Sequence, residues 1–493
     1  MQRKFITNLI LLLSLNLLIK PFWILGIDRS VQNVVGEEMY GFYFVVLNFS
    51  FLFNILLDLG ITNFNNRNIA QHKHLLNKHF SGIVVVRMML GVLYLAVTFL
   101  AALLYGFDKA QLGMLGWVAF NQLLLATILY LRSNISGLLL LRTDSIISVL
   151  DRLLMILFCS VLLWGNISET PFRIEWFVYA QTAAYIITSL IALGIVIVKA
   201  RFRKIYWHWP FFLMIIKRSL PFAILVMMMA FYNRIDPVLI NKLLPKPMGE
   251  IQSGIYAKGF RLFDAANQLA YLFAVLLLPI FSNLIQQKKD LVPMFRMAVS
   301  LLFTLSVTVA ITSWYFSAEL MNLLYPGENI DATRVFSILI FGFIAVSGIY
   351  VFGTLLTANG SLKQLNIIAG FAIATNLIIN IILIPRIMAV GSAYASLAAQ
   401  FLSMILQIFV VQYIFRFRVD YYFLSALALF VAGMFAGGYF LRKLPVEWYY
   451  EAALILLLAP VLATSLKLLN IKGFIKILRE REQLESGSSA AGD

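Results

Sequence analysis

Apolar runs of about 20 residues recur along almost the whole chain, and short segments that hold most of the charges separate them. As a helix, a run of this length spans the hydrocarbon core of a bilayer, which is about 30 Å thick. Only 13% of the 493 residues are charged, whereas about 25% are charged in soluble domains. Lipid must therefore surround most of the chain, and the sequence predicts an all-α, polytopic membrane protein.

The apolar runs predict fourteen transmembrane helices. Their approximate ranges are 6–27, 40–65, 82–106, 112–138, 144–165, 176–199, 212–242, 253–286, 292–316, 332–357, 363–385, 390–414, 421–441 and 447–469. We expect four parts: a six-helix lobe in 1–204, a second six-helix lobe in 205–415, two additional helices in 416–470 and a cytosolic tail in 471–493. Within the tail, a surface helix is expected over Lys472–Glu485, and Ser486–Asp493 is small and polar.

Two short sequence similarities suggest that the lobes are repeats. Ile27-Asp28 lies near the end of the first predicted span, and Ile235-Asp236 lies near the end of the seventh. Gly41-Phe42-Tyr43 then follows in one half and Gly254-Ile255-Tyr256 in the other. Six helices return the chain to its starting side, so the two lobes are predicted to be parallel and suited to alternating access.

Basic residues orient the predicted helices. The connections after even-numbered spans are richer in Lys and Arg: they hold Arg67, Lys73, Lys78, Arg142, Lys199, Arg201, Arg203, Lys204, Lys288, Lys289, Arg296, Lys363, Arg416 and Arg418. Loops rich in Lys and Arg face the cytosol. Both termini are therefore predicted to be cytosolic.

Composition and motifs argue against several other functions. The net charge of +16 is spread over short loops, so no nucleic-acid partner is expected. The single cysteine, Cys159, lies in an apolar run and forms no disulfide framework. His72, His74 and His79 lack the spacing of a metal site. The sequence contains no catalytic or nucleotide-binding motif, and its loops are too short for a catalytic domain.

Charged and amide side chains also occur inside the predicted spans or at their ends. They are Lys20, Asp28, Arg29, Asn54, Asp58, Arg234, Asp236, Lys258, Arg261, Asp264 and Gln268. A charge at the centre of such a helix costs about 2.5–3.5 kcal/mol, so these groups favour a cavity or a partner. The last four follow one another at spacings of three, three and four, which places them on one helical face. This face is predicted to line a cavity.

Other interpretations of these charges stay open. Lys20, Asp28 and Arg29 are near span ends, from which long side chains reach the headgroups. Asp144 and Arg152 are interpreted as interfacial, and Arg152 points to a different face from its neighbour Asp151. Since both signs occur, some of the charges are expected to be structural ion pairs.

The absence of a nucleotide-binding motif leaves an ion gradient as the intrinsic energy source for uphill transport. Asp58, Asp236 and Asp264 are the candidate carboxylates for coupling to H⁺ or Na⁺. The alternative is that each pairs with a neighbouring Arg or Lys. We expect no other cofactor and no metal.

Several segments resemble the Wzx-type O-antigen and oligosaccharide flippases, the polysaccharide branch of the MATE-like multidrug/oligosaccharidyl-lipid/polysaccharide superfamily. Near the N-terminus these are Tyr40-Gly41-Phe42-Tyr43, Leu57-Asp58-Leu59-Gly60-Ile61 and Arg67-Asn68-Ile69-Ala70. Further on they are Ala358-Asn359-Gly360, Asn376, Asn380, Ile384-Pro385 and Gly391-Ser392-Ala393-Tyr394-Ala395-Ser396. The order of these segments is similar to that in the family from about residue 20 to 400.

The resemblance implies a flippase of the bacterial inner membrane that carries an undecaprenyl-pyrophosphate-linked glycan from the cytosolic to the outer leaflet. It implies membrane lipids as further partners, together with glycan polymerase and ligase machinery. By this resemblance the substrate-binding candidates are Lys20, Arg29, Arg234, Lys258 and Arg261. Asn48 and Asn54 stand where family members often have Arg, so the headgroup contacts are expected to differ.

There are three rival functions. A multidrug or toxic-compound extruder of the same superfamily would have a ligand site dominated by carboxylates, and the basic groups of the eighth predicted span argue against it. A membrane-embedded glycan polymerase or acyltransferase would carry acid and base residues in a large outer loop. The longest predicted outer loops, near 317–333 and 166–176, are short. A non-transporting scaffold would have no use for the embedded charges.

Overall fold

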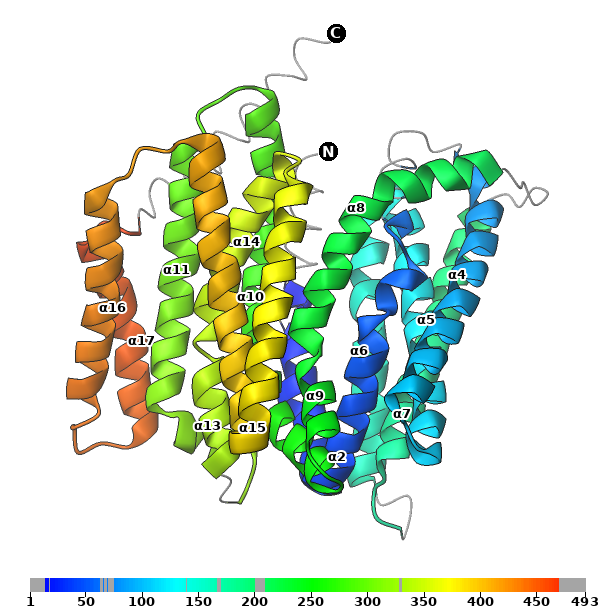
Figure 1. The fold of residues 1–493 in the computed structure, drawn as a ribbon, viewed down its shortest axis with the longest axis horizontal. Helices are drawn as coiled ribbons and strands as arrows, with labels where there is room; N and C mark the ends of the chain where they lie inside the picture. The colour runs from blue at the N-terminus through cyan, green and yellow to red at the C-terminus, as the bar shows by residue number, and fades with distance from the viewer. Residues whose placement is uncertain are drawn as a thin grey trace. The chain divides into compact units, whose positions relative to one another are not determined.

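The computed structural model describes residues 14–16, 18–62, 65, 69, 75–138, 140–165, 170–199, 209–327 and 330–469. Every regular element in these ranges is helical, which confirms the all-α prediction (Figure 1). Ten of the helices are long and apolar enough to cross a membrane, or eleven with one bent pair. The count of fourteen stays a prediction, and the expected tail helix over Lys472–Glu485 lies outside the described residues.

The chain forms two compact units, which contain 1–265, 322–338 and 362–399, and 266–321, 339–361 and 400–493. The helices that lie in or begin in the first unit are η1 (Trp23–Asp28), α2 (Arg29–Leu52), η2 (Asn54–Leu57), α4 (Leu75–Tyr105), α5 (Lys109–Gly137), α6 (Leu141–Trp164), α7 (Ile174–Lys199), α8 (Trp209–Arg234), α9 (Asp236–Leu243), α10 (Met248–Gln286), α13 (Ile330–Leu339) and α15 (Leu362–Phe415). Those that lie in or begin in the second are α11 (Val292–Tyr315), α12 (Ser317–Leu324), α14 (Gly342–Ala358), α16 (Tyr421–Leu441) and α17 (Trp448–Ser465). The predicted boundaries at 204, 415 and 470 stay predictions.

Backbone breaks divide three of the long apolar stretches. Gly36 has φ +80°, so η1 and the start of α2 form one helical stretch and the rest of α2 another. In α15, Met388 has φ +51° and the backbone at Ile387 is not helical. Its 54 residues would measure about 80 Å as one straight helix, far more than a bilayer requires. The third break, between α8 and α9, bends the backbone by 49°.

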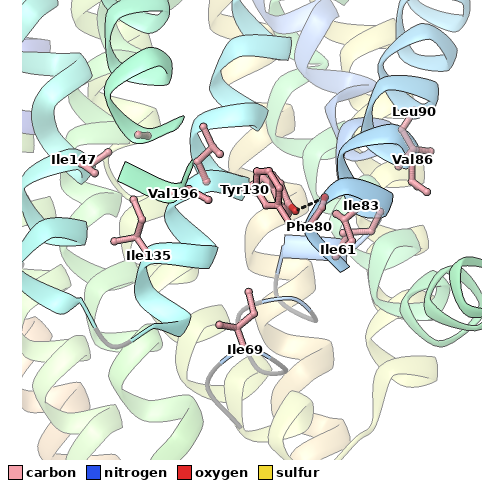
Figure 2. Close-up of a cluster of buried hydrophobic side chains, with 12 residues drawn as sticks. Ile61, Ile69, Phe80, Ile83, Val86, Leu90, Tyr130, Ile135, Ile147 and Val196 are labelled. Atoms are coloured by element: carbon pink, nitrogen blue, oxygen red, sulfur yellow. Dashed lines mark hydrogen bonds between the residues drawn. The ribbon is translucent and has the colours of Figure 1, made fainter. Parts of the chain in front are cut away.

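In the first unit, α5 packs along α7, and α6 lies against both (Figure 1). Figure 2 shows a buried cluster to which α4, α5, α6 and α7 contribute, together with Ile61 and Ile69. The ring of Tyr130 stacks on that of Phe80 at 5.8 Å, and its hydroxyl donates to the Phe80 carbonyl oxygen at 3.3 Å. Lipid tails are as apolar as these side chains, so close packing rather than escape from water stabilises the cluster.

The second unit has a core of its own, in which α11 contacts α14, α16 and α17. Val307 and Ile311 on α11 meet Phe430 on α16 and Ile455 on α17. An ionic cluster adds to this packing: Arg442 pairs with Glu319 and lies 3.4 Å from Glu451. These contacts attach the two most C-terminal described helices to the rest of the unit.

Candidate functional site

A buried ionic group joins η1 and α2 to α10 within the first unit. Arg261 Nε lies 2.8 Å from Asp28 Oδ2 and donates to the Tyr40 hydroxyl oxygen at 3.0 Å. The Tyr40 hydroxyl in turn donates to Asp28 Oδ2 at 2.9 Å. Asp28 is only 1% exposed, and an unpaired buried charge is strongly destabilising. The three side chains therefore depend on one another, and removing one leaves a charge or a hydroxyl unsatisfied.

A second ion pair lies one helical turn along α10. Lys258 Nζ is 2.6 Å from Glu37 Oε1, and the ammonium also lies 5.5 Å from the ring centre of Tyr325. Arg29, at the start of α2, is half-buried, and its Nε has no hydrogen-bond partner among the described residues. The predicted cavity-lining side chains Lys258 and Arg261 thus share one face, but both are engaged by carboxylates.

Asp236 forms a third group, without a cationic partner among the described residues. Its side chain is fully buried at the first residue of α9. Oδ2 accepts a hydrogen bond from the Tyr256 hydroxyl at 2.8 Å, and Oδ1 accepts from the amides of Asn376 and Asn380, each at 2.9 Å. All three donors are neutral. Asn380 Oδ1 is also buried and has no hydrogen-bond partner within the described part of the chain.

The other two carboxylate candidates occupy different surroundings. Asp58 Oδ1 lies 2.7 Å from Arg87 Nη1 and also accepts from the Thr62 side chain, while Arg87 Nη2 donates to the Ala126 carbonyl oxygen at 2.7 Å. This arrangement is the structural pairing considered as the alternative for Asp58. Asp264 is half-buried and lies near Lys20 and Asp28, within reach of their charges.

The remaining two basic candidates are not held by carboxylates at ion-pair distance within the described residues. Arg234, at the end of α8, lies over the rings of Phe51 and Phe260, with its guanidinium carbon 5.1 and 5.3 Å from their centres. Lys20 is half-buried just before η1. Pro21 follows it, and η1 has the π-helical form that often accompanies a kinked helix.

The sequence reasoning missed one basic residue of this region. Arg152 was interpreted as interfacial, but it lies halfway along α6, and its guanidinium carbon is 5.7 Å from the ring centre of Trp23. Its neighbour Asp151 is 3.7 Å away. The sequence did contain a signal for a buried position, since Arg152 is far from both ends of an apolar run. Its adjacency to Asp151 obscured that signal.

At one end of the first unit, the backbones of α2 and α10 are in close contact. A Cβ atom on Gly41 would overlap the carbonyl oxygen of Glu250, and a Cβ atom on Gly254 would overlap that of Glu37. The contact is reciprocal, as expected of two repeats related by a two-fold axis, although the repeat itself stays a prediction. Gln32 adds a hydrogen bond of 2.9 Å from its amide to the Gly254 carbonyl oxygen.

Two polar contacts lie at the same end of the first unit. Lys246 Nζ lies 2.6 Å from Asp108 Oδ2, and Lys242 donates to the Tyr105 carbonyl oxygen at 2.7 Å. The hydrogen bond from Lys246 and that from the Gln111 backbone hold the pKa of the Asp108 carboxyl below its ordinary value. The Asp108 carboxylate in turn raises the pKa of Lys246. We call these contacts, together with the Gly41–Gly254 contact and the Lys258–Glu37 pair, the closed end.

Solved structures share this fold. A structure of the lipid II flippase MurJ in an inward closed conformation is similar with a TM-score of 0.67 and 14% identity, covering 91% of this chain and 97% of that chain. An inward-facing multidrug resistance MATE family transporter of the MOP superfamily has a TM-score of 0.63 and 13% identity, with 83% and 100% covered. A MOP superfamily transporter from Pyrococcus furiosus has a TM-score of 0.55 and 12% identity, with 82% and 92% covered. At these identities the likeness shows the fold alone.

The helices define a multi-pass, all-α membrane protein with the fold of these flippase and transporter structures. Residues 6–285 match the model of the family described as polysaccharide biosynthesis protein. This match covers more than half of the sequence, so the chain belongs to that family. A comparison with curated protein sequences gives no match. The resemblance expected from the short sequence motifs is thereby confirmed.

Proposed function

We propose that the protein is a flippase that moves an undecaprenyl-pyrophosphate-linked oligosaccharide from the cytosolic to the outer leaflet of a bacterial inner membrane. The observation that carries the proposal is the buried ionic group of Asp28, Tyr40 and Arg261 in a chain of the polysaccharide biosynthesis family. Hydrocarbon excludes pyrophosphate and sugar, because each unpaired polar group there costs several kcal/mol. Polar and basic side chains between helices offer the headgroup a route.

In this proposal, Arg261 and Lys258 exchange their carboxylate partners for the pyrophosphate of the substrate. Arg261 is held by Asp28 in the arrangement described here, and Lys258 is held by Glu37. A pyrophosphate offers the same charge-assisted hydrogen bonds as a carboxylate, and it suits the forked donors of arginine. Substrate entry would therefore compete with Asp28 for Arg261 and with Glu37 for Lys258. Such competition links binding to the contacts of the closed end.

Alternating access follows from the same contacts. We propose that the closed end faces the outside, as the distribution of Lys and Arg in the loops predicts. Opening it requires Gly41 to separate from Gly254 and Lys246 to separate from Asp108. A substrate shifts this equilibrium only by as much as it binds one arrangement better than the other. The ion pairs of Lys258 and Arg261 supply that difference.

For ion coupling we propose Asp236 over Asp58. Arg87 already neutralises Asp58, whereas Asp236 has only neutral donors among the described residues. The buried oxygens of Asp236 and Asn380 form a set that suits a proton or a small hard cation such as Na⁺. A bound cation or proton would supply the positive charge that this carboxylate lacks. Asp264 stays a candidate because of its half-buried position near Lys20.

The rival functions fit these contacts less well. A cation extruder needs a carboxylate that an organic cation can reach, but Arg261 engages Asp28, Arg87 engages Asp58, and Asp236 is fully buried. An enzyme needs acid and base groups in a water-accessible site, and apolar helices occupy most of the described chain. We therefore propose a transporter rather than an enzyme, supplying glycan to polymerase and ligase machinery.

A reconstituted assay tests this function. Purified protein is placed in liposomes with a fluorescent undecaprenyl-pyrophosphate-linked oligosaccharide, and an external glycosidase reports the glycan that reaches the opposite leaflet. We expect exposure of the glycan well above that in protein-free liposomes, and slower exposure with Arg261→Ala. Rates equal to those of empty liposomes would remove the proposal. Transport of cationic dyes without glycan movement would favour the multidrug extruder.

A further inference from the structure

An apolar cavity lies between α8 and α15 in the first unit, at the end where α15 begins. Its volume is 440 Å³, and its lining consists of Leu220, Ile224 and Met228 of α8 and Lys363, Asn366 and Ile367 of α15. Leu220 and Ile367 are 46% and 51% exposed, so the cavity opens at the surface of the described chain. None of the lining residues belongs to the ionic groups of the candidate site.

Contacts on one side of the cavity hold the two helices together. Tyr232 of α8 belongs to a buried cluster with Ala372 of α15. Further along, Asp236 accepts hydrogen bonds from Asn376 and Asn380 of α15. The cavity occupies the space between the helices on the other side of these contacts, toward the start of α15. Its shape therefore follows from helix packing rather than from the position of one side chain.

The lining decides what can fill this cavity. A water molecule takes up about 30 Å³ and needs roughly two to four polar partners. Only Lys363 and Asn366 offer polar groups, which are too few for the waters that such a volume would hold. Protein interiors are close-packed, so an empty space of this size is also unfavourable. α15, and α8 from Ala223 onward, are apolar enough to cross a membrane, which places the cavity beside lipid. A hydrocarbon chain is the occupant that suits it.

Lys363 gives one edge of the cavity a positive charge. It is the second residue of α15, its side chain is exposed, and within the described ranges no carboxylate lies at ion-pair distance from it. A lysine near the end of a membrane span can extend its ammonium to the lipid headgroups. A phospholipid combines the hydrocarbon chain that the lining requires with a phosphate for the ammonium. Lysine near a membrane surface attracts anionic lipids in particular.

We propose that this cavity is a binding site for an anionic phospholipid, with one acyl chain against Ile224, Met228 and Ile367 and the phosphate at Lys363. The loop charges predict that the lipid belongs to the cytosolic leaflet. The flexible Met228 side chain suits an acyl chain, which has no fixed shape. This site is separate from the proposed path of the glycan, and the inference does not rest on the flippase function. The ligand binds against the helix that leads into Asp236.

The test measures lipid preference at the cavity itself. The full-length protein carries Phe371→Cys in a Cys159→Ser background, labelled with the fluorophore bimane. Phe371 is exposed and lies one turn beyond Ile367 on the same face of α15. The labelled protein is placed in phosphatidylcholine liposomes that contain increasing fractions of phosphatidylglycerol, and either lipid carries bromine on its chains to quench the fluorophore. We expect a preference of about fivefold for phosphatidylglycerol, which corresponds to about 1 kcal/mol.

Two variants assign that preference to the proposed contacts. Lys363→Gln should abolish it and Lys363→Arg should retain it; since Lys363 is exposed, neither change disturbs the core. Ile224→Trp, which fills the cavity, should also abolish it. Lys289→Gln is the matched control, because Lys289 is an exposed lysine that does not line this cavity. It should leave the preference unchanged.

Three results would overturn the proposal. If the unmodified protein shows no preference, the cavity holds only ordinary bilayer lipid. If Lys363→Gln keeps the full preference, the phosphate does not bind at Lys363. If a small fraction of undecaprenyl pyrophosphate relieves the quenching by brominated phosphatidylglycerol, the cavity belongs to the prenyl chain of that lipid instead.

Discussion

Gly41 and Gly254 meet so closely that neither position has room for a side chain. A Cβ atom on Gly41 would lie 2.7 Å from the backbone nitrogen of Gly254, and it would overlap the carbonyl oxygen of Glu250. A Cβ atom on Gly254 would meet Glu37 in the same way. Since the obstacles are main-chain atoms, they yield only if the helices separate. The two glycines therefore set how near α2 and α10 come at the closed end.

Gly254→Ala should open that end. Overpacking of this kind costs about 1–3 kcal/mol, which raises the population of open molecules about fivefold or more. Gln32, which is buried at the contact, provides the readout as Gln32→Cys in a Cys159→Ser background. A membrane-impermeant maleimide added from outside should label it at least fivefold faster when Gly254→Ala is also present.

Gly113→Ala is the control for this experiment, because a Cβ atom at this helical position meets nothing within 4 Å. It should leave the labelling rate unchanged. If Gly254→Ala and Gly113→Ala label at the same rate, the contact does not hold the end closed.

Arg442→Met should destabilise the second unit. The change leaves Glu451, whose side chain is only 6% exposed, and Glu319 without their cation. An unsatisfied buried group costs about 1–3 kcal/mol, more when it is charged, so the free energy of unfolding in detergent should fall by about that much. The neighbouring exposed substitution Lys443→Met should change it by less than about 0.5 kcal/mol. Adding Glu451→Gln to Arg442→Met should restore part of the loss, and no restoration would argue against the ionic explanation.

The Asp108–Lys246 pair predicts a pH dependence with a defined sign. The folded-state pKa of Asp108 is lowered from 3.8, so its contribution to stability is complete above that value and is lost as the pH falls through the folded-state pKa. The pKa of Lys246 is raised from 10.5, so its contribution is complete below that value and is lost as the pH rises through the folded-state pKa. Both side chains are about half exposed, so the pair contributes only ~0.2–1 kcal/mol.

Asp108→Asn isolates this effect, because asparagine also caps helices and can still accept the hydrogen bond from the Gln111 backbone. The difference in unfolding midpoint between the unmodified protein and Asp108→Asn should be constant from about pH 5 to 9 and should shrink below pH 3.8. A difference that grows on acidification would contradict the pairing.

Asp236→Asn and Asp58→Asn should separate coupling from structure. Asp236→Asn keeps the shape of the side chain but removes its charge, so it should retain glycan binding and lose stimulation by an imposed H⁺ or Na⁺ gradient. Asp58→Asn leaves Arg87 poorly paired and should lower the free energy of unfolding by about 1–3 kcal/mol, with the gradient response intact. Full stimulation in Asp236→Asn, Asp58→Asn and Asp264→Asn alike would exclude all three carboxylates and indicate a facilitator.

The sequence predicted the helices well, because composition and run length decide what enters a bilayer. The spacing of Lys258 and Arg261 also predicted correctly that they share a face. Their carboxylate partners could not be predicted, since Glu37 and Asp28 lie more than 200 residues away along the chain. Periodicity within one helix carries no information about which other helix faces it.

The surroundings of Asp236 show the same limit. Asn376 and Asn380 belong to the segments that resemble the family, yet their hydrogen bonds to Asp236 depend on how α15 packs beside α9. The break between α8 and α9 leaves only a weak trace in the sequence, namely Pro237 near the start of α9. The position of Arg152 shows a related limit, because its adjacency to Asp151 favours an interfacial interpretation although it lies midway along α6.

The break between α8 and α9 also has an electrical consequence. It places the Asp236 carboxylate ~12 Å of helix axis from the end of α9 at Leu243, inside the low-dielectric part of the protein. A full elementary charge that crosses a membrane at 100 mV exchanges about 2.3 kcal/mol with the field, and a charge that crosses part of the way exchanges a fraction of this. Any proton or cation that reaches Asp236 passes through part of the transmembrane voltage. Under the coupling proposed for Asp236, occupancy of the carboxylate would therefore depend on membrane potential as well as on ion concentration.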